Sequence, residues 1–323
     1  MKVIVCRELG PPSVLRLEER APRPLGPGQA RVALRAAGVN YPDLLMVAGG
    51  YQLKPPLPFT PGMEGAGVVV EAAPDAASWR PGDRVIVRMR PGTFAEEVVV
   101  DAGALLAMPA PFSFEEAAVY MVGHGTAWHA LSDRGRLAVG ETLLVHGASG
   151  GVGLAAVEVG KLLGARVIAT GGDAAKLEAV RARGAAETID LRDGFRERVL
   201  ELTEGRGADV IYDPVGGEVF DGSLRCVAWR GRILVIGFPA GIPKVPADLA
   251  LLKGIAVVGV RAGEYARRDP ARGRADRERL LALANEGRLR PHISHRLPLA
   301  RAAEALELLR DRKAIGKAVL VMP

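Results

Sequence analysis

A glycine-rich segment, His146-Gly147-Ala148-Ser149-Gly150-Gly151-Val152-Gly153, has the spacing of a nucleotide-binding loop. Its glycines follow a G-x-x-G-x-x-G pattern, one position away from the common G-x-G-x-x-G. Such glycines allow a tight turn and let the backbone approach a pyrophosphate. The strand pattern ETLLVH precedes the loop and the helical pattern LAAVEVGKLLG follows it, so the helix would offer free N–H groups to phosphates. The residues expected to bind a dinucleotide are Gly147, Ser149, Gly150, Gly151, Val152 and Gly153.

The residue that follows the next strand pattern, ARVIAT, helps to distinguish an NAD site from an NADP site. NAD sites usually place Asp or Glu there, which accepts a hydrogen bond from the ribose 2′-hydroxyl. The aligned residue is Gly171, where a 2′-phosphate meets no charge repulsion, and Lys176 or Arg192 could neutralise that phosphate. We therefore expect NADPH. Asp173 is expected to be the N-cap of the following helix, although a small rotation could aim it at a ribose.

From about residue 123 onward, strand patterns alternate with helical patterns of 10–15 residues. This alternation predicts βαβ units and a doubly wound parallel sheet. The strands are expected near 141–146, 165–170, 186–190, 208–213, 232–237 and 254–260, and a helix is expected over 218–231. A basic, poorly periodic stretch follows over 261–276, and helical patterns return at 277–287 and 300–311.

Residues 1–122 have a different pattern, which predicts mostly β structure. Short apolar stretches such as KVIVCRE, ARVALRAAGV, GAGVVVEA and DRVIVRM are separated by turn signals rich in Pro and Gly. Short strands at this spacing are typical of an antiparallel sandwich or barrel, and the repeated prolines disfavour long helices.

Motifs spread over essentially the whole chain resemble those of one enzyme superfamily. They are Gly38-Val39-Asn40-Tyr41-Pro42-Asp43, Pro61-Gly62-Met63-Glu64-Gly65-Ala66-Gly67, Pro81-Gly82-Asp83-Arg84-Val85, Gly125-Thr126-Ala127, Asp213-Pro214-Val215-Gly216-Gly217 and Gly316-Lys317. In this order they resemble the zinc-independent quinone oxidoreductases, the zeta-crystallin-like group of the medium-chain dehydrogenase/reductase superfamily. The resemblance implies a β-rich, GroES-like catalytic domain beside a Rossmann domain.

The chain departs from this group at two positions. Glu158 stands where these reductases usually have Gln, and Leu191 stands where a member places a Tyr near the 2′-phosphate. The second change leaves Lys176 and Arg192 as the residues expected to contact that phosphate.

The segments that hold catalytic zinc in other members of the superfamily lack the zinc ligands here. By resemblance, those members have a Cys in the segment matching 38–43 and a His in the segment matching 62–65. Here the segments read GVNYPD and GMEG, so Met63 replaces the His, and neither Cys6 nor Cys226 lies in them. Catalytic zinc needs about three protein ligands. We therefore expect no metal.

Without a metal, the substrate must accept a hydride unaided, which favours a quinone and, next, an activated enal or enone. The coenzyme carries the hydride and the protein orients it. Asn40 could donate a hydrogen bond to the carbonyl oxygen of the acceptor. Tyr51 and Tyr41 could line the pocket or donate a proton, and His124 could line a substrate cleft between the domains. We expect His129, five positions on, to lie on a helix and to be structural.

The resemblance also implies further contacts with the coenzyme and with a second chain. Thr126 resembles a hydroxyl near the nicotinamide, Phe238 follows a strand at the carboxyl edge of the sheet, and Lys317 matches a position near the nucleotide. The apolar strand Gly254–Val260 is expected at the sheet edge, where it could pair with a second copy in a homodimer.

Composition restricts the class of protein further. The chain has 323 residues, 49% hydrophobic and 25% charged, as in an ordinary globular protein of about two domains. Only two cysteines occur, which excludes a disulfide framework and indicates a reducing compartment. The start of the chain has no extended apolar region and no apolar run approaches the ~20 residues of a membrane span, so a cytoplasmic location is expected.

Two alternatives remain open at this point. One is an NADPH-dependent enal, enone or enoyl-thioester reductase, for which Tyr41 or Tyr51 could serve as the acid. The other is a non-enzyme, such as an RNA-binding or structural crystallin-like protein. The net charge of +6 is too weak for a nucleic-acid binder, and the arginines of 261–279 are interleaved with acids and only one aromatic, Tyr265. We therefore expect a salt-bridged surface there.

The sequence thus predicts a two-domain α/β reductase. The GroES-like catalytic domain is expected over 1–122, the Rossmann domain over 123–263, and a C-terminal segment over 264–323 is expected to complete the catalytic domain. The active site is expected between the two.

Overall fold

The computed structural model describes residues 1–323, which form two compact units. Unit 1 consists of Met1–Met121 and Ala284–Pro323, and unit 2 consists of Val122–Leu283. Each unit has its own sheet and its own buried apolar cluster. Unit 1 is β-rich and unit 2 is a parallel α/β fold, which confirms the predicted fold class.

Unit 1 is built on a seven-stranded sheet. The strand order is β14-β15-β3-β4-β5-β7, with β6 also paired to β3, and β14 and β15 are its parallel pair. The strands are β3 (Gln29–Val39), β4 (Glu64–Ala72), β5 (Arg84–Arg88), β6 (Glu97–Asp101), β7 (Leu105–Ala107), β14 (Ile293–Pro298) and β15 (Lys317–Val321), beside a separate ribbon of β1 (Lys2–Val5) and β2 (Arg16–Glu19). The helices are α1 (Tyr41–Val47), α10 (Ala302–Arg310) and the short turns η1 (Pro12–Val14), η2 (Ala102–Ala104) and η5 (Leu299–Arg301).

The register of this sheet brings three distant segments to one corner of unit 1. Glu64, at the start of β4, pairs with Gly38 near the end of β3. The second residue of β15, Ala318, pairs with Val39. Asn40, which follows β3, and Lys317, which begins β15, therefore both lie next to Glu64.

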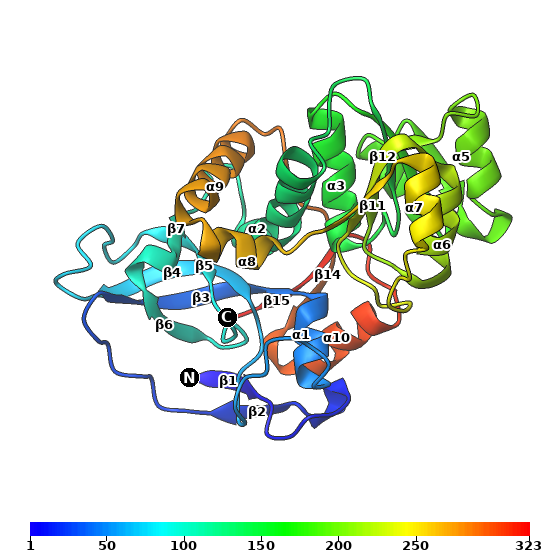
Figure 1. Cartoon of the computed structure of the whole chain (residues 1–323). Helices are drawn as coiled ribbons and strands as arrows, with labels where there is room; N and C mark the ends of the chain where they lie inside the picture. The colour runs from blue at the N-terminus through cyan, green and yellow to red at the C-terminus, as the bar shows by residue number, and fades with distance from the viewer. The chain divides into compact units, whose positions relative to one another are not determined.

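Unit 2 is a six-stranded parallel sheet in the order β10-β9-β8-β11-β12-β13, with helices packed against it (Figure 1). Counted from β8, this is the 3-2-1-4-5-6 order of a dinucleotide-binding fold. The strands are β8 (Thr142–Val145), β9 (Arg166–Gly171), β10 (Glu187–Asp190), β11 (Ala208–Asp213), β12 (Val227–Val235) and β13 (Ala256–Gly259). The helices are α3 (Gly151–Leu162), α4 (Ala174–Ala182), α5 (Arg196–Leu202), α6 (Gly217–Cys226), α7 (Ala247–Lys253), α8 (Ala262–Arg268), the π-helix η3 (His129–Arg134) and the short 3-10 helix η4 (Leu191–Asp193).

Two helices, α2 (Phe114–Trp128) and α9 (Pro270–Asn285), contain the points at which the chain passes from one unit to the other. None of the helices combines the length and the apolar character needed to cross a membrane.

The structure differs from the sequence prediction in two segments. Helix α6 ends at Cys226 rather than at residue 231, because Val227 already pairs with Ala208 of the neighbouring strand. The stretch 264–283 belongs to unit 2 rather than to the C-terminal segment of the catalytic domain. The basic stretch forms α8 and the start of α9, and Trp128 Nε1 donates to Asp276 Oδ1 at 3.1 Å, which holds α9 against unit 2.

Candidate functional site

The glycine-rich loop lies between β8 and α3, as the sequence predicts. Gly147 turns the chain with a φ of +53°, and Ala148 donates its N–H to the carbonyl oxygen of Thr170 at 3.0 Å. A Cβ added at Gly153 would lie 2.3 Å from the carbonyl oxygen of Gly147, so only glycine fits at this close approach.

The start of α3 presents backbone donors to this loop. Gly150 is the extended N-cap, and its lack of a side chain leaves the first N–H groups of the helix uncapped. No acidic side chain stands in the first turn. These donors and the positive end of the helix dipole fit a pyrophosphate. The predicted loop residues that line this turn are Gly147, Ser149, Gly150, Gly151, Val152 and Gly153.

A second loop, which follows β11, packs against the glycine loop. The strand order reverses between β8 and β11, which is where ligands bind in folds of this kind. Asp213 Oδ1 accepts hydrogen bonds from the N–H groups of Val215 (2.8 Å) and Gly216 (2.9 Å) and so shapes the loop. Burial raises the pKa of Asp213, and its Oδ2 has no partner. Phe238 packs against Gly216 in the neighbouring loop and is partly exposed.

His146 fixes the glycine loop to its surroundings. Its Nδ1 lies 2.8 Å from Thr170 Oγ1, and its Nε2 lies 2.9 Å from Ser223 Oγ. Complete burial lowers the pKa of His146 to about 3, so the ring is neutral at physiological pH. Sequence reasoning missed this role, because one partner lies on the neighbouring strand β9 and the other on helix α6.

The residues expected to select the coenzyme lie at the end of β9 and beyond it. Gly171 ends β9, and a Cβ there would lie 3.1 Å from Leu177 Cδ2. Asp173 is the N-cap of α4 and accepts from Ala175 N at 2.9 Å, as predicted. Lys176 lies in the first turn of α4.

The guanidinium of Arg192 is bonded to the carboxylate of Asp190. The guanidinium makes several hydrogen bonds to Asp190, the shortest 2.5 Å long, and lowers the pKa of that carboxyl to about 2. Of the two expected partners for a 2′-phosphate, Arg192 would therefore have to share its charge with Asp190.

In unit 1, Asn40 lies in a buried cluster of polar side chains. Its Oδ1 accepts a hydrogen bond from Lys317 Nζ at 2.5 Å, and its Nδ2 donates to Glu64 Oε1 at 3.1 Å. Lys317 Nζ also lies 3.0 Å from Glu64 Oε1. All three side chains are buried, so Lys317 is not a solvated surface lysine.

The carboxylate of Asp43 accepts hydrogen bonds from the backbone next to this cluster. Its Oδ2 accepts from Asn40 N at 2.9 Å and its Oδ1 accepts from Gly62 N at 3.1 Å. Burial raises the pKa of Asp43 to about 7, although the two backbone hydrogen bonds and the Lys317 charge oppose that rise. Sequence reasoning named Asn40 and Lys317 but did not connect them with Asp43 and Glu64.

The two candidate tyrosines lie outside this cluster. Tyr41 begins α1 directly after Asn40 and is partly exposed. Tyr51 follows α1 and packs against the apolar core of unit 1.

His124, which the sequence suggested could line a substrate cleft, has little exposed surface. It is buried in α2, and its Nε2 lies 2.8 Å from Glu158 Oε2. Arg183 donates to the other oxygen of Glu158 at 2.6 Å. Glu158 thus ties His124 and Arg183 together. In the same helix, the hydroxyl of Thr126 donates to the carbonyl oxygen of Val122 at 2.7 Å.

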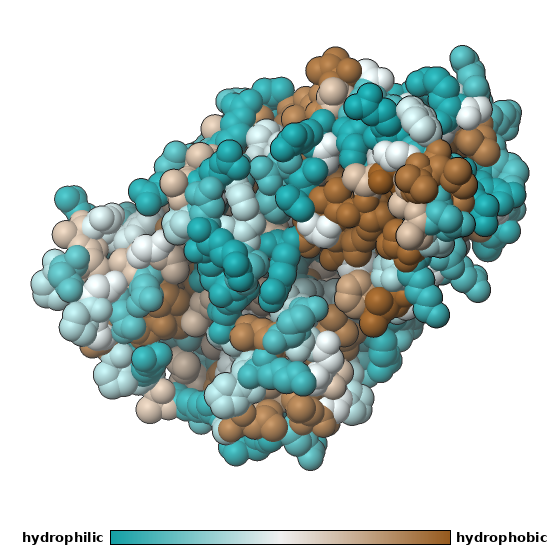
Figure 2. Space-filling model, in the orientation of Figure 1, coloured by the Kyte–Doolittle hydropathy of each residue, from teal (hydrophilic) through white to brown (hydrophobic).

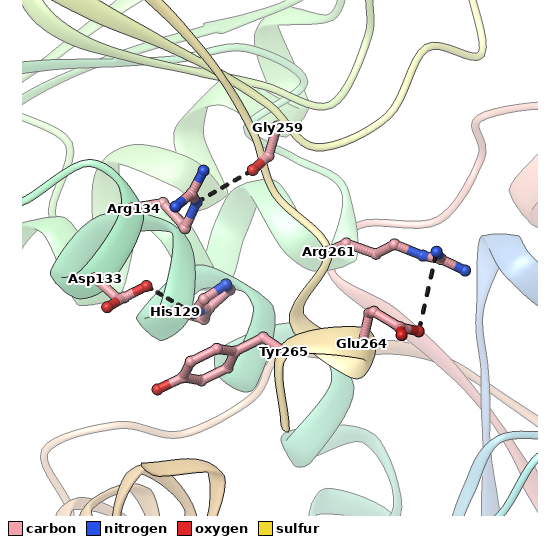
Figure 3. A pocket seen from close by; sticks show the side chains of 7 residues that line it. All are labelled: His129, Asp133, Arg134, Gly259, Arg261, Glu264 and Tyr265. Carbon is pink, nitrogen blue, oxygen red and sulfur yellow. Dashed lines mark hydrogen bonds and ion pairs between the residues drawn. The ribbon is translucent and has the colours of Figure 1, made fainter. Parts of the chain in front are cut away.

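An open pocket of about 220 Å³ lies at the carboxyl end of β13, beside η3 and α8 (Figure 3). The ring of His129 stacks on that of Tyr265, with centroids 4.0 Å apart, and burial lowers the pKa of His129. Figure 3 shows the guanidinium of Arg261 directed at Glu264, 3.9 Å away. The lining residues are His129, Asp133, Arg134, Gly259, Arg261, Glu264 and Tyr265. Sequence reasoning named none of them as a site residue.

The arginine-rich segment around this pocket is a salt-bridged surface, as expected. Arg267 and Arg268 both pair with Glu264, and Arg272 lies 3.8 Å from Asp269. In these ion pairs, acidic side chains partly neutralise the arginines that could otherwise contact the phosphates of a nucleic acid.

No group of three or more His, Cys, Asp or Glu side chains is arranged to hold a metal ion. Glu64 is the sole acid of the segment 62–65, and it contacts the ammonium group of Lys317. Cys6 and Cys226 are buried, free and in different units.

Comparisons with known proteins agree with this architecture. Residues 26–110 match the family described as alcohol dehydrogenase GroES-like domain, and residues 151–280 match the family described as zinc-binding dehydrogenase. The quinone oxidoreductase-like protein 2 homolog of Nematostella vectensis is 39% identical over 324 residues, which cover 99% of this chain and 88% of that protein. The quinone oxidoreductase of Pseudomonas aeruginosa is 37% identical, and the match covers 97% of each chain. The chain belongs to the quinone oxidoreductase group of the medium-chain dehydrogenase/reductase superfamily.

Solved structures extend the comparison to the whole fold of this oxidoreductase. Escherichia coli quinone oxidoreductase complexed with NADPH has a TM-score of 0.91 and 29% identity, with 100% of both chains covered. The JamJ enoyl reductase has a TM-score of 0.88 and 27% identity, covering 100% of this chain and 99% of that one. A protein described as an enoyl reductase thus shares this fold.

Proposed function

We propose that this oxidoreductase transfers a hydride from NADPH to a quinone without the help of a metal ion. The observation that carries the proposal is the buried cluster of Asn40, Glu64 and Lys317. By resemblance, zinc-dependent members of the superfamily bind their metal with the segments that match 38–43 and 62–65. In this chain those segments contribute the Asn40 amide and the Glu64 carboxylate, and both are bonded to the ammonium group of Lys317. A Zn²⁺ ion at this place would meet the positive charge of Lys317 and too few ligands. A quinone needs no Lewis acid, because hydride and proton uptake yields an aromatic hydroquinone.

The chain's own groups would bind and orient the reactants. Bound NADPH supplies the hydride. The N–H groups of the glycine loop and of the first turn of α3 would hold its pyrophosphate, with Thr126 and Phe238 near the coenzyme. Asn40 would donate a hydrogen bond from Nδ2 to the acceptor oxygen on which negative charge develops.

The proton that completes the reduction would come from solvent, Tyr41 or Tyr51. His124 is the weakest candidate, because it is buried and its Nε2 is bonded to Glu158. Proton transfer from His124 would require that bond to break.

A preference for NADPH over NADH is part of this proposal. Gly171 offers no acid to accept from a ribose 2′-hydroxyl, and Asp173 is occupied as the N-cap of α4. Lys176 in the first turn of α4 and Arg192, which also bonds Asp190, are the two cations that we assign to the 2′-phosphate.

The second candidate function is reduction of an enal, enone or enoyl thioester by NADPH. The likeness to an enoyl reductase favours it, since both chains match almost over their full length. Reduction of a C=C bond needs a proton at carbon, for which Tyr41 or Tyr51 would be the donor. Turnover of a medium-chain enal in place of a quinone would select this function.

We also propose a homodimer that pairs through the edge strand β13, which has a neighbour in its sheet, β12, on one side only. Figure 2 shows apolar side chains gathered over α7, which precedes β13. Edge strands of this kind readily pair with a second chain. The large apolar side chains exposed in this part of the chain are Trp229, Phe238, Ile242, Val245, Leu251 and Leu252.

A cytoplasmic location completes the proposal, and the two free, buried thiols support a reducing compartment.

The experiment that tests the proposed function follows NADPH oxidation by chelator-treated protein with a simple benzoquinone. NADH in place of NADPH and a medium-chain enal in place of the quinone are run alongside, and an enzyme-free control corrects for direct reaction of quinone with NADPH. We expect rapid turnover with NADPH and quinone. Turnover of the enal alone would contradict the quinone assignment.

A further inference from the structure

Lys317 is held inside unit 1 by bonds to two side chains. It is 6% exposed, and its ammonium group contacts Asn40 Oδ1 (2.5 Å) and Glu64 Oε1 (3.0 Å). Its backbone N–H donates to the carbonyl oxygen of His292 at 2.9 Å, which fixes the start of β15. The ammonium group of Lys317, which the family resemblance places near the nucleotide, therefore faces Asn40 and Glu64.

The chemistry of these two partners allows one orientation of the Asn40 amide. An ammonium group can only donate hydrogen bonds, and a carboxylate can only accept them. Oδ1 must therefore face Lys317 and Nδ2 must face Glu64, as observed. A flipped amide would place donor against donor and acceptor against acceptor.

This arrangement leaves one donor of Asn40 only weakly bonded. One N–H of Nδ2 is bonded to Glu64, and the other reaches the carbonyl oxygen of Gly38 only at 3.5 Å, too far for a strong bond. The positive charge of Lys317 on Oδ1 also draws electrons from the amide, which strengthens that remaining donor.

We propose that Lys317 and Glu64 are positioning residues that hold and polarise the Asn40 amide, and that Lys317 is not a ligand of the nucleotide. The inference rests on the proposed function, in which Asn40 donates to the reacting carbonyl. It separates binding of NADPH from the hydride step. Loss of Lys317 slows turnover and leaves coenzyme affinity unchanged.

The kinetic test compares Lys317→Met with Lys317→Arg in the full-length protein. In Lys317→Met we expect kcat with benzoquinone to fall at least about tenfold, while the Kd for NADPH, from nucleotide fluorescence, stays within about twofold. Lys317→Arg keeps a cationic donor near Oδ1 and recovers part of kcat. Adding Asn40→Ala to Lys317→Met causes less further loss than Asn40→Ala causes alone, because the two residues act as a unit.

A matched control is Lys253→Met. Lys253 is also bonded, here to the carbonyl oxygens of Leu224 (3.0 Å) and Arg225 (2.9 Å), but it lies in α7, away from this cluster. We expect its kcat to equal that of the wild type. A Kd for NADPH that rises at least about tenfold in Lys317→Met, with kcat unchanged at saturating coenzyme, would overturn the proposal and make Lys317 a nucleotide ligand.

A second readout does not depend on activity. The chain has two asparagines, Asn40 and Asn285, so ¹⁵N-asparagine labelling gives two side-chain amide signals, which Asn285→Asp assigns. We expect slow hydrogen exchange at the Asn40 amide, and a shifted, faster-exchanging signal in Lys317→Met and in Glu64→Gln. An unchanged signal would overturn the proposal. Failure of all acceptors with the wild-type protein, together with the expected shift, would instead overturn the proposed function, because the amide would still be held by Lys317.

Discussion

The imidazole Nδ1 of His146 lies 2.8 Å from the hydroxyl of Thr170, and this contact joins the ends of two neighbouring parallel strands at the glycine loop. His146 directly precedes Gly147, the residue that turns the chain. The ring also reaches Ser223 of α6 at 2.9 Å. A single neutral side chain therefore links β8, β9 and α6 beneath the loop.

This link makes stability sensitive to acid. The pKa of His146 is about 3 in the fold and about 6.5 in the unfolded chain, so the unfolded state binds the proton first as pH falls. The stabilisation is complete above pH ~6.5 and is lost progressively down to pH ~3. At pH ~5 the loss from this residue is about 2 kcal/mol.

His146→Gln isolates the effect, because glutamine can still bond both hydroxyls but does not titrate. We expect the free energy of unfolding in urea to fall between neutral pH and pH ~5 by about 2 kcal/mol less in the variant than in the wild type. Equal losses in the two proteins would show that His146 does not carry the acid sensitivity.

Gly153→Ala tests the close approach within the glycine loop. The added Cβ would lie 2.3 Å from the Gly147 carbonyl oxygen and 2.9 Å from Ala148 Cα, and both are backbone atoms that cannot move without reshaping the loop. We expect a loss of stability of about 1–3 kcal/mol and a Kd for NADPH raised at least about tenfold. The control is Gly103→Ala, where an added Cβ meets nothing within 4 Å. An unchanged Kd for NADPH would contradict the assignment of this loop to the pyrophosphate.

Gly171→Asp tests the choice of coenzyme. A carboxylate there repels a 2′-phosphate and accepts a hydrogen bond from a 2′-hydroxyl. The nearest atom to the new Cβ is the end of the Leu177 side chain, at 3.1 Å, which can give way. We expect the ratio of kcat/KM for NADPH to that for NADH to fall at least about tenfold.

Lys176→Ala is the complementary variant. We expect Lys176→Ala to raise KM for NADPH and to leave KM for NADH unchanged, because only NADPH carries the 2′-phosphate that this charge would attract. Equal effects of Lys176→Ala on both coenzymes would show that this lysine does not contact the 2′-phosphate.

Ala256→Lys tests association through β13. Ala256 is exposed at the edge of the sheet, and a charge on an edge strand opposes pairing with another chain. We expect light scattering with size-exclusion chromatography to show a dimer for the wild type and a monomer for the variant. Val139→Lys, at an exposed position outside β13 and α7, should remain dimeric. A dimer that persists in Ala256→Lys would place the interface elsewhere.

Features that are determined by residues close together in the sequence were predicted best. The glycine loop between β8 and α3 and the N-cap at Asp173 follow from local patterns and were confirmed. The helices α8 and α9 were harder to predict, because ion pairs such as Arg268 with Glu264 stabilise a surface that lacks apolar periodicity.

The polar clusters could not be predicted from local patterns. Asn40 and Lys317 are 277 positions apart and meet only through the register of β15 on β3. The same holds for His146 with Ser223, and for His124 with Glu158, which lie on different elements of the fold.

We propose above that NADPH transfers a hydride to a quinone without a metal and that Asn40 contacts the acceptor oxygen. The most direct measurement is single-turnover oxidation of bound NADPH by benzoquinone, followed by stopped flow, on protein in which elemental analysis finds no zinc. We predict a fast rate that added Zn²⁺ does not raise and that Asn40→Ala lowers about 100-fold. Loss of the reaction on chelation, with recovery on adding Zn²⁺, would contradict the account.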